Sequence, residues 1–583
     1  MAMVAMAARP IPISTAVRRK PVKVEAGLSK SKAAKSELAR PQLAKPKLGL
    51  RAWMERVPVE CDRAAAGFEA DPVHDLRVAL RRCRSLADGL IALDPDASWK
   101  EMKRAGKKLF QALGELRDMQ VMEEWIEKLG FAENAAGVAA ADAADGVAGD
   151  PVAGRLLNHI HAREAECKVR AFKDLNQFDR KQWRQWTRAL PHRAARVRPG
   201  SAVYLHLALE KWTAGYELHK HALRTRSQAS WHALRIGIKR FRYTVENFLP
   251  RQHELWGSDL KELQDLLGEV HDLDVLWATA VEIMAFPDIE HQRRWREKLN
   301  AERAKRIERY REKMVGKQSL WQVWRAELPA GAQLRAAAMS RLRVWAGYLD
   351  PDFAHSQRVA QMALLLYDGL RAAGLLTADA AAEWDHAQDG FGKVHDPRAV
   401  LQAAALLHDV GKTKGAANHQ KASYRMIRGL ALPLGWSARE LQLAAVVARY
   451  HRGALPRPRA KTMQMLELTD RAMATEAAGI LRLANALDAQ HGQSGNGRRG
   501  NEIGVRERTA SSARAVVGLE VELQDRAVVV RVAGYSPLDR SAEGIAAARH
   551  LLETVLRRPV IVRALRSSAT GRQPAGRMGL MGS

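Results

Sequence analysis

A basic segment that occurs twice in this chain limits what its first half can fold into. One copy reads HDLRVALRRCRS from His74, and the other reads HALRIGIKRFRY from His232. Both copies carry histidine at position i, arginine at i+3, a basic residue at i+7 and arginine at i+10. At about 100° per residue, these positions fall within roughly 80° of one another on a helix. We call the two sets the first and second basic stripes, and their members are His74, Arg77, Arg81 and Arg84, and His232, Arg235, Lys239 and Arg242.

A second pair of matched segments follows the stripes. LGELRDMQV begins at Leu113 and LGEVHDLDV begins at Leu267, so the order of stripe, spacer and LGE-x-(R/H)-D repeats along the chain. Lys107, Lys108 and Arg117 are further basic candidates around the first of these segments, and His271 stands where the first half has Arg117. The repeat predicts two helical halves that pack about a pseudo-twofold axis and bring both stripes to one surface.

The charge of these stripes points to an anionic ligand. Like charges at i,i+3 and i,i+4 destabilise a helix by about a few tenths of a kcal/mol per pair, so a bound anion would relieve the repulsion. The whole chain has a net charge of +29, with 94 Lys and Arg against 65 Asp and Glu. Such a balance favours a polyanionic partner, although a merely basic, solvated face remains an alternative.

Inorganic polyphosphate fits the stripes better than nucleic acid does. It presents a row of charges and no bases, which suits extended arginine forks and lysine point charges. Single-stranded nucleic acid would call for aromatic stacking platforms, and the segments carry only Phe241 and Tyr243. No RNP, KH, zinc-finger or basic-zipper pattern is present, so we do not expect nucleic acid as a specific ligand.

The doubled HxxR(V/I)xx(R/K)RxR pattern resembles the CHAD, or conserved histidine α-helical, domain. The resemblance covers about 280 residues and implies a helical bundle with internal pseudo-twofold symmetry. It also implies that inorganic polyphosphate binds in a basic central channel. By position, the eight stripe residues would line that channel, with Lys107, Lys108 and Arg117 as weaker candidates. The resemblance implies no catalysis in this region.

A different set of chemical groups lies in the second half of the chain. His and Asp side chains recur there, and these types suit divalent metals such as Mn, Fe, Co, Ni or Zn. Two metals that share a carboxylate would activate water and hold a phosphate ester. Lys412, one turn after Asp409, is a candidate to stabilise a phosphoryl oxygen, so Asp409 and Lys412 are the catalytic candidates. The metal-ligand candidates are His355, His408, Asp409, His419, His451 and Asp488.

This second region resembles the HD superfamily of metal-dependent phosphohydrolases. The order His355, His408-Asp409, Asp488 matches the four-ligand pattern, and the expected cofactor is a divalent metal, Mn, Fe, Ni, Co, Zn or Mg, whose identity stays open. Within the superfamily, the region is most similar to the C-terminal part of the exopolyphosphatase/guanosine pentaphosphatase family. That family hydrolyses polyphosphate with an actin-like ATPase-fold domain, which this chain lacks. The branch that cleaves cyclic dinucleotides has paired histidines near the position of His451, where this chain has Tyr450 and Arg452.

Further arginines near this region are candidates for an anion track. They follow the helix that precedes His451 and would extend the path of an anionic substrate to the metal ligands. The four residues are Arg449, Arg452, Arg457 and Arg459.

We therefore predict a mainly α protein with a CHAD helical bundle, a second all-helical HD domain and a small β-β-α-β subdomain. The strand-like VVGLEVELQ and AVVVRVAGY flank a turn at Asp525-Arg526, and a helix and VIVRAL follow. Loop-like boundaries are expected near 132–152 and 328–335. The predicted domains are a basic disordered tail (1–48), the CHAD domain (49–330), the HD-type domain (335–497), the α/β subdomain (510–566) and a loose tail (567–583).

Two functions remain open at this point. The first is a polyphosphate-binding protein whose HD module hydrolyses polyphosphate or a phosphorylated nucleotide with a divalent metal. The alternative is a non-enzymatic protein that targets polyphosphate granules and carries a degenerate HD domain. Three widely spaced cysteines, the absence of about 18 consecutive apolar residues and an N-terminus unlike a signal peptide predict a cytoplasmic protein without a membrane span.

Overall fold

The computed structural model describes residues 49–129, 150–376, 396–494, 518–538 and 541–565. The predicted tails, 1–48 and 567–583, lie outside these residues, and so does most of the boundary predicted near 132–152. No helix among the described residues is long and apolar enough to cross a membrane. Cys61, Cys83 and Cys167 are buried free thiols.

The first part of the chain is entirely helical in its described residues. In the described residues, ten helices precede the predicted boundary near 328–335, which covers the link between α10 and α11 and the first turn of α11. Their bounds are α1 (Leu50–Ala65), α2 (Ala70–Ile91), α3 (Ala97–Lys128), α4 (Pro151–Asn176), α5 (Arg180–Ala194), α6 (Ala202–Thr225), α7 (Gln228–Phe248), α8 (Pro250–Glu282), α9 (Ile289–Met314) and α10 (Leu320–Ala326).

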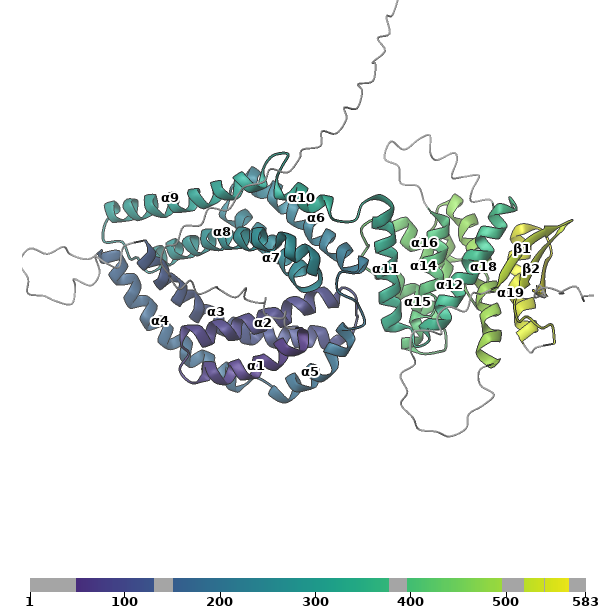
Figure 1. Cartoon of the computed structure of the whole chain (residues 1–583), viewed down its shortest axis with the longest axis horizontal. Coiled ribbons are helices and arrows are strands. Elements are labelled where there is room, and N and C mark those ends of the chain that lie inside the picture. The colour runs from purple at the N-terminus through teal and green to yellow at the C-terminus, as the bar shows by residue number, and fades with distance from the viewer. Residues whose placement is uncertain (1–48, 130–149, 377–395, 495–517, 539–540, 566–583) are drawn as a thin grey trace, which may run out of the picture. The chain divides into compact units, whose positions relative to one another are not determined.

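These helices pack as the sequence repeat predicts. Consecutive helices of α1 to α4 contact one another, and the same succession of contacts recurs from α6 to α9. The two halves meet where α2 contacts α7 and where α3 contacts α8, so each of these four helices contacts its counterpart in the other half. Figure 1 places α2 and α7 between α9 on one side and α1 and α5 on the other. The helices that carry the two basic stripes are therefore interior neighbours.

An apolar face on each stripe helix explains this interior position. On α2, Leu76, Leu80 and Cys83 are fully buried, and the corresponding Leu234, Ile238 and Phe241 of α7 are buried as well. These residues recur at the i, i+4, i+7 spacing of one helix face. At about 1.5–3 kcal/mol for each large apolar side chain, their burial outweighs the repulsion within the stripes.

The second part of the described chain packs around its own core. Helices from α11 onward bury alanine, valine and leucine against the small sheet and α19. The bounds are α11 (Gly331–Leu349), α12 (Phe353–Ala372), α14 (Pro397–Leu407), the 3₁₀ helix η2 (Val410–Lys414), α15 (His419–Arg428), α16 (Ala438–Arg449), α17 (Lys461–Gln464), α18 (Leu468–Ser494), β1 (Leu519–Gln524), β2 (Ala527–Val532), α19 (Ser541–Leu556) and β3 (Val560–Ala564).

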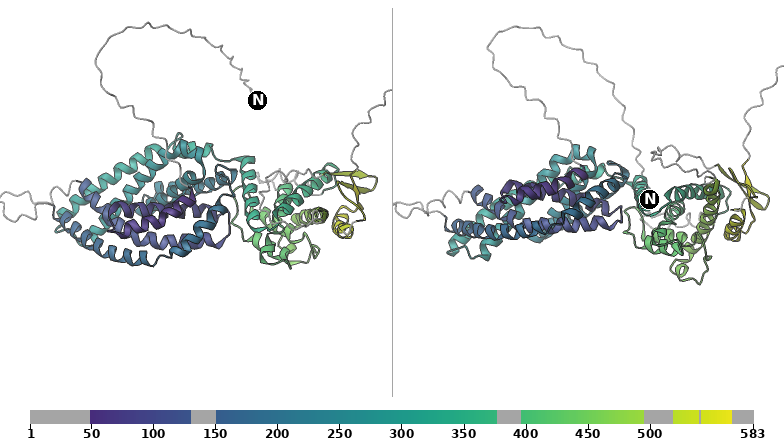
Figure 2. Two further views of the ribbon diagram at one scale, coloured as in Figure 1. Left: turned by 60° about the horizontal axis from the view of Figure 1, so that its bottom comes forward. Right: turned by 90° about the horizontal axis from the view of Figure 1, so that it is seen from below.

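The C-terminal unit has the predicted β-β-α-β order. β1 and β2 form an antiparallel hairpin whose turn includes Asp525 at φ 48°, and β3 lies parallel to β2 after the α19 crossover. In both views of Figure 2 the yellow strands and α19 lie against the green helices. Close packing here requires glycine, because a Cβ at Gly369 of α12 would lie 2.6 Å from the Val521 Cβ. The strands therefore complete the core beneath α12 and α18.

Candidate functional site

The two basic stripes occupy α2 and α7 as expected from the repeat. His74 is exposed, and the other seven stripe residues are half-buried. Partial burial removes some of the water that stabilises a cation, so it favours a partner of opposite charge. Their position between packed helices raises the question of what neutralises them.

The pKa of Lys239 shows that the stripes face each other. Burial, together with the nearby guanidinium groups of Arg81 and Arg235, lowers this pKa to about 7. Arg77 and Arg84 act in the same direction, so three of the four arginines come from the opposite helix. A lysine surrounded by cations from both stripes marks a concentrated positive potential between α2 and α7.

Several stripe cations have no anionic partner within the described chain. Arg81, Arg235 and Lys239 form neither a hydrogen bond nor an ion pair with any described residue. The buried Nε of Arg84 also has no hydrogen-bond partner among those residues. Arg242 has only a distant ion pair, at 3.9 Å, with Glu246. The donors of the stripes are thus available to an anion from outside.

Local contacts hold the first stripe in place without neutralising it. Arg77 donates a hydrogen bond to the Leu113 carbonyl at 2.7 Å. The guanidinium groups of Arg77 and Arg84 lie 4.4 and 4.8 Å from the ring centroid of Phe110. Phe110 lies on α3, so this helix fixes two stripe arginines through its ring and its backbone. Such positioning reduces the entropy that the side chains lose when an anion binds.

The three weaker candidates have different surroundings. Lys107 and Lys108 are exposed, and Lys108 donates to Gln177, the residue after α4, at 3.1 Å. Arg117 pairs with Glu124 at 3.1 Å and lies close enough to His74 to lower the pKa of that histidine. Its counterpart His271 places Nδ1 3.2 Å from Nδ1 of His232. Arg117 and His271 therefore occupy matching places beside the first histidine of each stripe.

Two carboxylates on α3 and α8 accompany the stripes, and sequence reasoning did not select them. Burial raises the pKa of Asp118, although Arg77 and Arg235 oppose this shift. Burial also raises the pKa of Asp272 to about 6, and Asp118 contributes to the same shift. Both residues end the LGE-x-(R/H)-D segments, so the repeated motif was the signal that could have identified them.

The second candidate site gathers five of the predicted metal ligands. His355 comes from α12, His408 and Asp409 from the end of α14, His419 from the start of α15 and His451 from the residue after α16 and its cap. Two groups have ligand atoms within 4.8 Å of one another: His355 with His408 and Asp409, and Asp409 with His419 and His451. Both groups contain Asp409, so its carboxylate lies between two potential metal positions.

Three of these histidines are held in the same tautomer by the same kind of hydrogen bond. Nδ1 of His408, His419 and His451 donates to the carbonyl three residues earlier, at 2.7, 2.9 and 2.8 Å. Each Nε2 is then left as an unprotonated lone pair, which is what a metal requires. Nε2 of His408 and Oδ1 of Asp409 are buried without a hydrogen-bond partner among the described residues. These orphaned ligand atoms fit a metal centre.

The charge of Asp409 is stabilised by its neighbours. Burial would raise its pKa, but His408 and Lys412 hold the pKa far below its ordinary value. The Lys412 ammonium contacts Oδ2 of this carboxylate. Asp409 is therefore a carboxylate throughout the physiological pH range, as a bridging ligand must be.

Gly411 allows the metal-ligand candidates to approach one another. A Cβ at this position would lie 2.3 Å from the His419 carbonyl oxygen and 2.5 Å from the Ser423 nitrogen. The Ser423 hydroxyl donates to the His408 carbonyl at 2.6 Å and accepts from the Gly411 amide at 2.9 Å. The turn after Asp409 consequently lies directly on α15, which brings His419 to Asp409.

Asp488 lies beside this cluster but is engaged elsewhere. Arg358 donates two hydrogen bonds to its carboxylate, at 2.7 and 2.8 Å, and Nδ1 of His355 donates a third at 2.6 Å. Neither potential metal group includes Asp488. Burial would lower the pKa of His355, but Asp488 and Asp409 raise it. Arg358 was not selected from the sequence, although it lies one turn after His355 on the same helix face.

The candidate anion track follows His451. Arg449 is half-buried with an unpartnered Nη1 among the described residues, whereas Arg452, Arg457 and Arg459 are exposed. Arg482 of α18 donates to the carbonyls of Tyr450 and Gly453 at 3.0 and 3.1 Å, which fixes the start of this segment.

Comparison with known proteins covers both regions. Residues 49–281 match the CHAD domain family, and residues 342–510 match domain III of the Ppx/GppA phosphatases. A crystal structure of the CHAD domain from the plant Ricinus communis is similar to 48% of this chain and covers 90% of its own, with 20% identity and a TM-score of 0.30. No curated protein matches the chain. The resemblances to the CHAD domain and to the C-terminal part of the exopolyphosphatase/guanosine pentaphosphatase family are confirmed by these two matches.

Proposed function

Because the chain contains a CHAD domain followed by a region of the Ppx/GppA phosphatase domain III family, we propose that it binds inorganic polyphosphate and carries a metal-dependent phosphohydrolase module. The second module would act on polyphosphate or on a phosphorylated nucleotide. The observation that carries the binding proposal is the pair of facing stripes whose cations Arg81, Arg235 and Lys239 form no hydrogen bond or ion pair with any described residue.

Three properties of polyphosphate match the chemistry of the stripes. Its repeating charges can neutralise cations on both helices at once, as a single small anion cannot. Its oxygens accept the forked hydrogen bonds of arginine. It has no bases, and the aromatic ring nearest the first stripe, Phe110, is already covered by Arg77 and Arg84. The eight stripe residues are the proposed binding set, with Arg117 beside His74.

The binding proposal is tested with Arg77→Ala/Arg235→Ala in a filter or mobility assay with long-chain polyphosphate. We expect at least about a tenfold loss of affinity at moderate salt, because two charged donors are removed. Arg184→Ala/Arg188→Ala on α5 is the matched control, since both arginines are exposed and the net charge changes equally. Unchanged affinity in the stripe variant would remove the stripes from the proposal.

The catalytic proposal rests on the Asp409-centred cluster. His355 and His408 with Asp409 would hold one divalent metal, and Asp409 with His419 and His451 would hold a second. Such metals activate water and neutralise phosphoryl oxygens. Lys412 contacts Asp409 with its ammonium, which has three donors in all, so it can also donate to a phosphoryl oxygen. Arg449, Arg452, Arg457 and Arg459 would attract an anionic substrate.

The test of catalysis incubates the protein with long-chain polyphosphate and Mn, Fe, Co, Ni, Zn or Mg in turn and follows free phosphate. We expect release with at least one metal and loss of both release and bound metal in Asp409→Ala. Asp368→Ala is the control, because Asp368 is an exposed aspartate paired with Arg398. No release with any metal would contradict the exopolyphosphatase proposal.

A second candidate function is a non-enzymatic polyphosphate-binding protein that is targeted to polyphosphate granules. The engagement of Asp488 by Arg358 favours it, since a carboxylate with three strong hydrogen bonds is a poorer metal ligand. Metal analysis of the purified protein distinguishes the two functions. Absence of metal together with intact polyphosphate binding supports the non-enzymatic function, whereas stoichiometric metal supports the enzyme.

A further inference from the structure

The two basic stripes have matching sequences, but the helices that support them differ at two positions that matter for packing. Counted from the repeated LGE segments, Phe110 of α3 corresponds to Gln264 of α8. By the same count, Gly106 of α3 corresponds to Leu260 of α8. Equivalent arginines of α2 and α7 therefore meet different supporting surfaces.

In the first half, α3 fits closely around the stripe. The Phe110 ring lies under the guanidinium groups of both Arg77 and Arg84. The Leu113 carbonyl accepts a hydrogen bond from Arg77. Arg84 also lies along Gly106, where an added Cβ would be only 3.5 Å from the Arg84 Cγ. Both arginines are thus held against α3 before any ligand binds.

The second half does not hold its arginines in this way. Arg235, the counterpart of Arg77, forms no hydrogen bond or ion pair with any described residue. Arg242 corresponds to Arg84, and the ring near its guanidinium is that of its own neighbour Tyr243, 5.9 Å away. No described contact therefore fixes these two side chains on α8 as the first pair is fixed on α3.

A pair of equivalent glycines shows the same difference without reference to the aromatic ring. A Cβ at Gly114 of α3 would lie 3.4 Å from Nη1 of Arg77. A Cβ at the corresponding Gly268 of α8 would meet no described atom within 4 Å. Arg235 therefore does not lie on α8 as Arg77 lies on α3.

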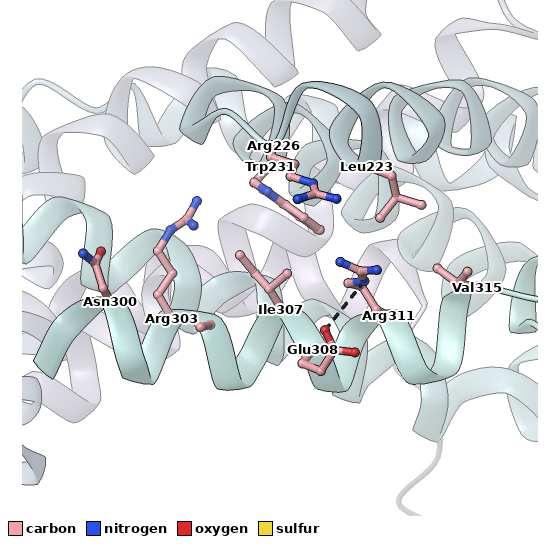
Figure 3. A pocket seen from close by; sticks show the side chains of 10 residues that line it. Leu223, Arg226, Trp231, Asn300, Arg303, Ile307, Glu308, Arg311 and Val315 are labelled. Atoms are coloured by element: carbon pink, nitrogen blue, oxygen red, sulfur yellow. Dashed lines mark ion pairs between the residues drawn. The ribbon is translucent and has the colours of Figure 1, made fainter. Parts of the chain in front are cut away.

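The second half also has an unmet polar group and unfilled space. Oε1 of Gln264 is buried and has no hydrogen-bond partner among the described residues. Figure 3 shows a pocket of about 440 Å³ between α9, the end of α6 and the start of α7. Trp231, which lines this pocket, directly precedes His232 of the second stripe. Side chains of this half can therefore change position without first opening a packed core.

We propose that the first stripe is a preformed anchor for the polyanion and that the second stripe orders on it after contact, with Phe110 as the positioning residue that creates the difference. An arginine that is already held loses less conformational entropy on binding, so it contributes more affinity for the same charge. This inference rests on the proposed binding of polyphosphate and adds which half carries most of it.

The test compares matched variants of the full chain by filter binding of long-chain polyphosphate across a salt series. Phe110→Leu removes the ring but keeps an apolar side chain, and it should raise the Kd about tenfold, because two arginines must then be ordered on binding. The slope of log affinity against log salt should stay unchanged, since no cation is lost. Phe110→Tyr, which keeps the ring, should retain the affinity, and Gln264→Leu should change the Kd by less than about twofold.

A double-mutant cycle separates positioning from general structural damage. The effects of Phe110→Leu and Arg77→Gln on the Kd should be clearly less than additive, because the ring acts through the arginine. Those of Gln264→Leu and Arg235→Gln should add. If Phe110→Leu weakens folding, Arg77→Lys and Arg235→Lys give the same comparison with both charges kept, and Arg77→Lys should then raise the Kd more.

The contrary results distinguish this inference from the proposed function. Equal losses in Arg77→Gln and Arg235→Gln, with additive effects of Phe110→Leu, would overturn the anchor and leave polyphosphate binding in place. A smaller salt slope in Phe110→Leu would also overturn it, since the ring would then control how many cations bind. Unchanged affinity in both arginine variants would instead contradict binding by the stripes.

Discussion

The basic stripes and the His/Asp cluster differ in which charge the protein leaves uncompensated. Among the described residues, the stripes carry half-buried cations such as Arg81 and Lys239 with no anionic partner. In the cluster the opposite holds, because Asp409 and Asp488 are surrounded by cations and histidines, while ligand atoms such as Nε2 of His408 point at no donor. One region presents cations to which an anion could bind, and the other presents ligand atoms of the types that bind a small cation.

The two regions offset the free-energy cost of burying charge in different ways. The stripes rely on apolar residues on the opposite faces of α2 and α7, so the helices remain packed without a ligand. The cluster relies on hydrogen bonds that fix tautomers and on Lys412, so its geometry is set before any metal arrives. Mutations should therefore separate binding of a polyanion from binding of a metal.

The largest expected effect is in Asp409→Asn. The amide keeps the size of the side chain but removes the charge shared by both potential metal groups. We expect loss of bound metal and a fall in phosphate release of at least about a hundredfold, since even outer-shell changes cost roughly 10–100-fold. Polyphosphate affinity should stay unchanged. The two measurements are metal analysis and phosphate release, and a parallel loss of polyphosphate binding would contradict the separation of the regions.

The second-largest expected effect is a loss of polyphosphate affinity in Arg81→Gln/Arg235→Gln, which changes one residue in each stripe. Each phosphate contact contributes about 0.7–0.9 to the slope of log affinity against log salt, so the slope should fall by roughly 1.5. Affinity near 0.1 M salt should fall by about tenfold or more. Filter binding across a salt series measures both. Arg184→Gln/Arg188→Gln, with the same charge change on α5, should leave the slope nearly intact; equal effects in both pairs would mean that only net charge matters.

The sequence predicts the regular parts of both regions well, because they depend on periodicity. Two helices with matched stripes, their contact, and the β-β-α-β order all follow from spacing and repetition. The resemblance to the CHAD domain could be drawn from the doubled motif alone. The residue types and order of the metal-ligand candidates are also distinctive in the sequence, and five of the six lie in the two groups that share Asp409.

The remaining features depend on contacts between segments that no local pattern encodes. Gly411 is needed because α15 approaches its Cα, and this approach is visible only in three dimensions. The same holds for the pairing of Arg358 with Asp488 and for the pocket around Trp231, whose walls come from three helices. Lys239 was predicted as a stripe cation, but its lowered pKa depends on arginines of the opposite helix.

A third prediction concerns pH and Lys239. Its pKa of about 7 in the folded protein means that it gains a proton as pH falls from 8 to 6. Asp272, with its pKa raised to about 6, begins to lose its negative charge over the lower part of that range. Both changes add positive charge between the stripes. Polyphosphate affinity should therefore rise by about three- to tenfold from pH 8 to pH 6, at constant ionic strength.

In the protein without bound polyphosphate, the same fall in pH lowers the free energy of unfolding. An unfolded lysine has a pKa near 10.4, so between about pH 10 and 7 the unfolded chain binds more protons than the folded one. The free energy of unfolding therefore falls as pH falls through that window, because Lys239 resists protonation in the folded protein. Bound polyphosphate should offset this loss of stability. Lys239→Arg keeps a permanent charge and should flatten the pH dependence of binding. An unaltered pH profile in this variant would exclude Lys239 as the titrating group.

The smallest expected effect is in Arg358→Gln, which addresses whether Asp488 can serve as a ligand. In the structure Arg358 competes with any metal for both carboxylate oxygens. Removing it should leave Asp488 free to contribute and tighten metal binding by several-fold, measured by competition with a chelator. Arg398→Gln is a close control, because Arg398 makes the same two hydrogen bonds to the exposed Asp368. Tighter binding only in Arg358→Gln would assign Asp488 to the metal centre. Unchanged affinity in both would leave Asp488 as the residue that orients His355 through Nδ1, and would limit the centre to the ligands that share Asp409.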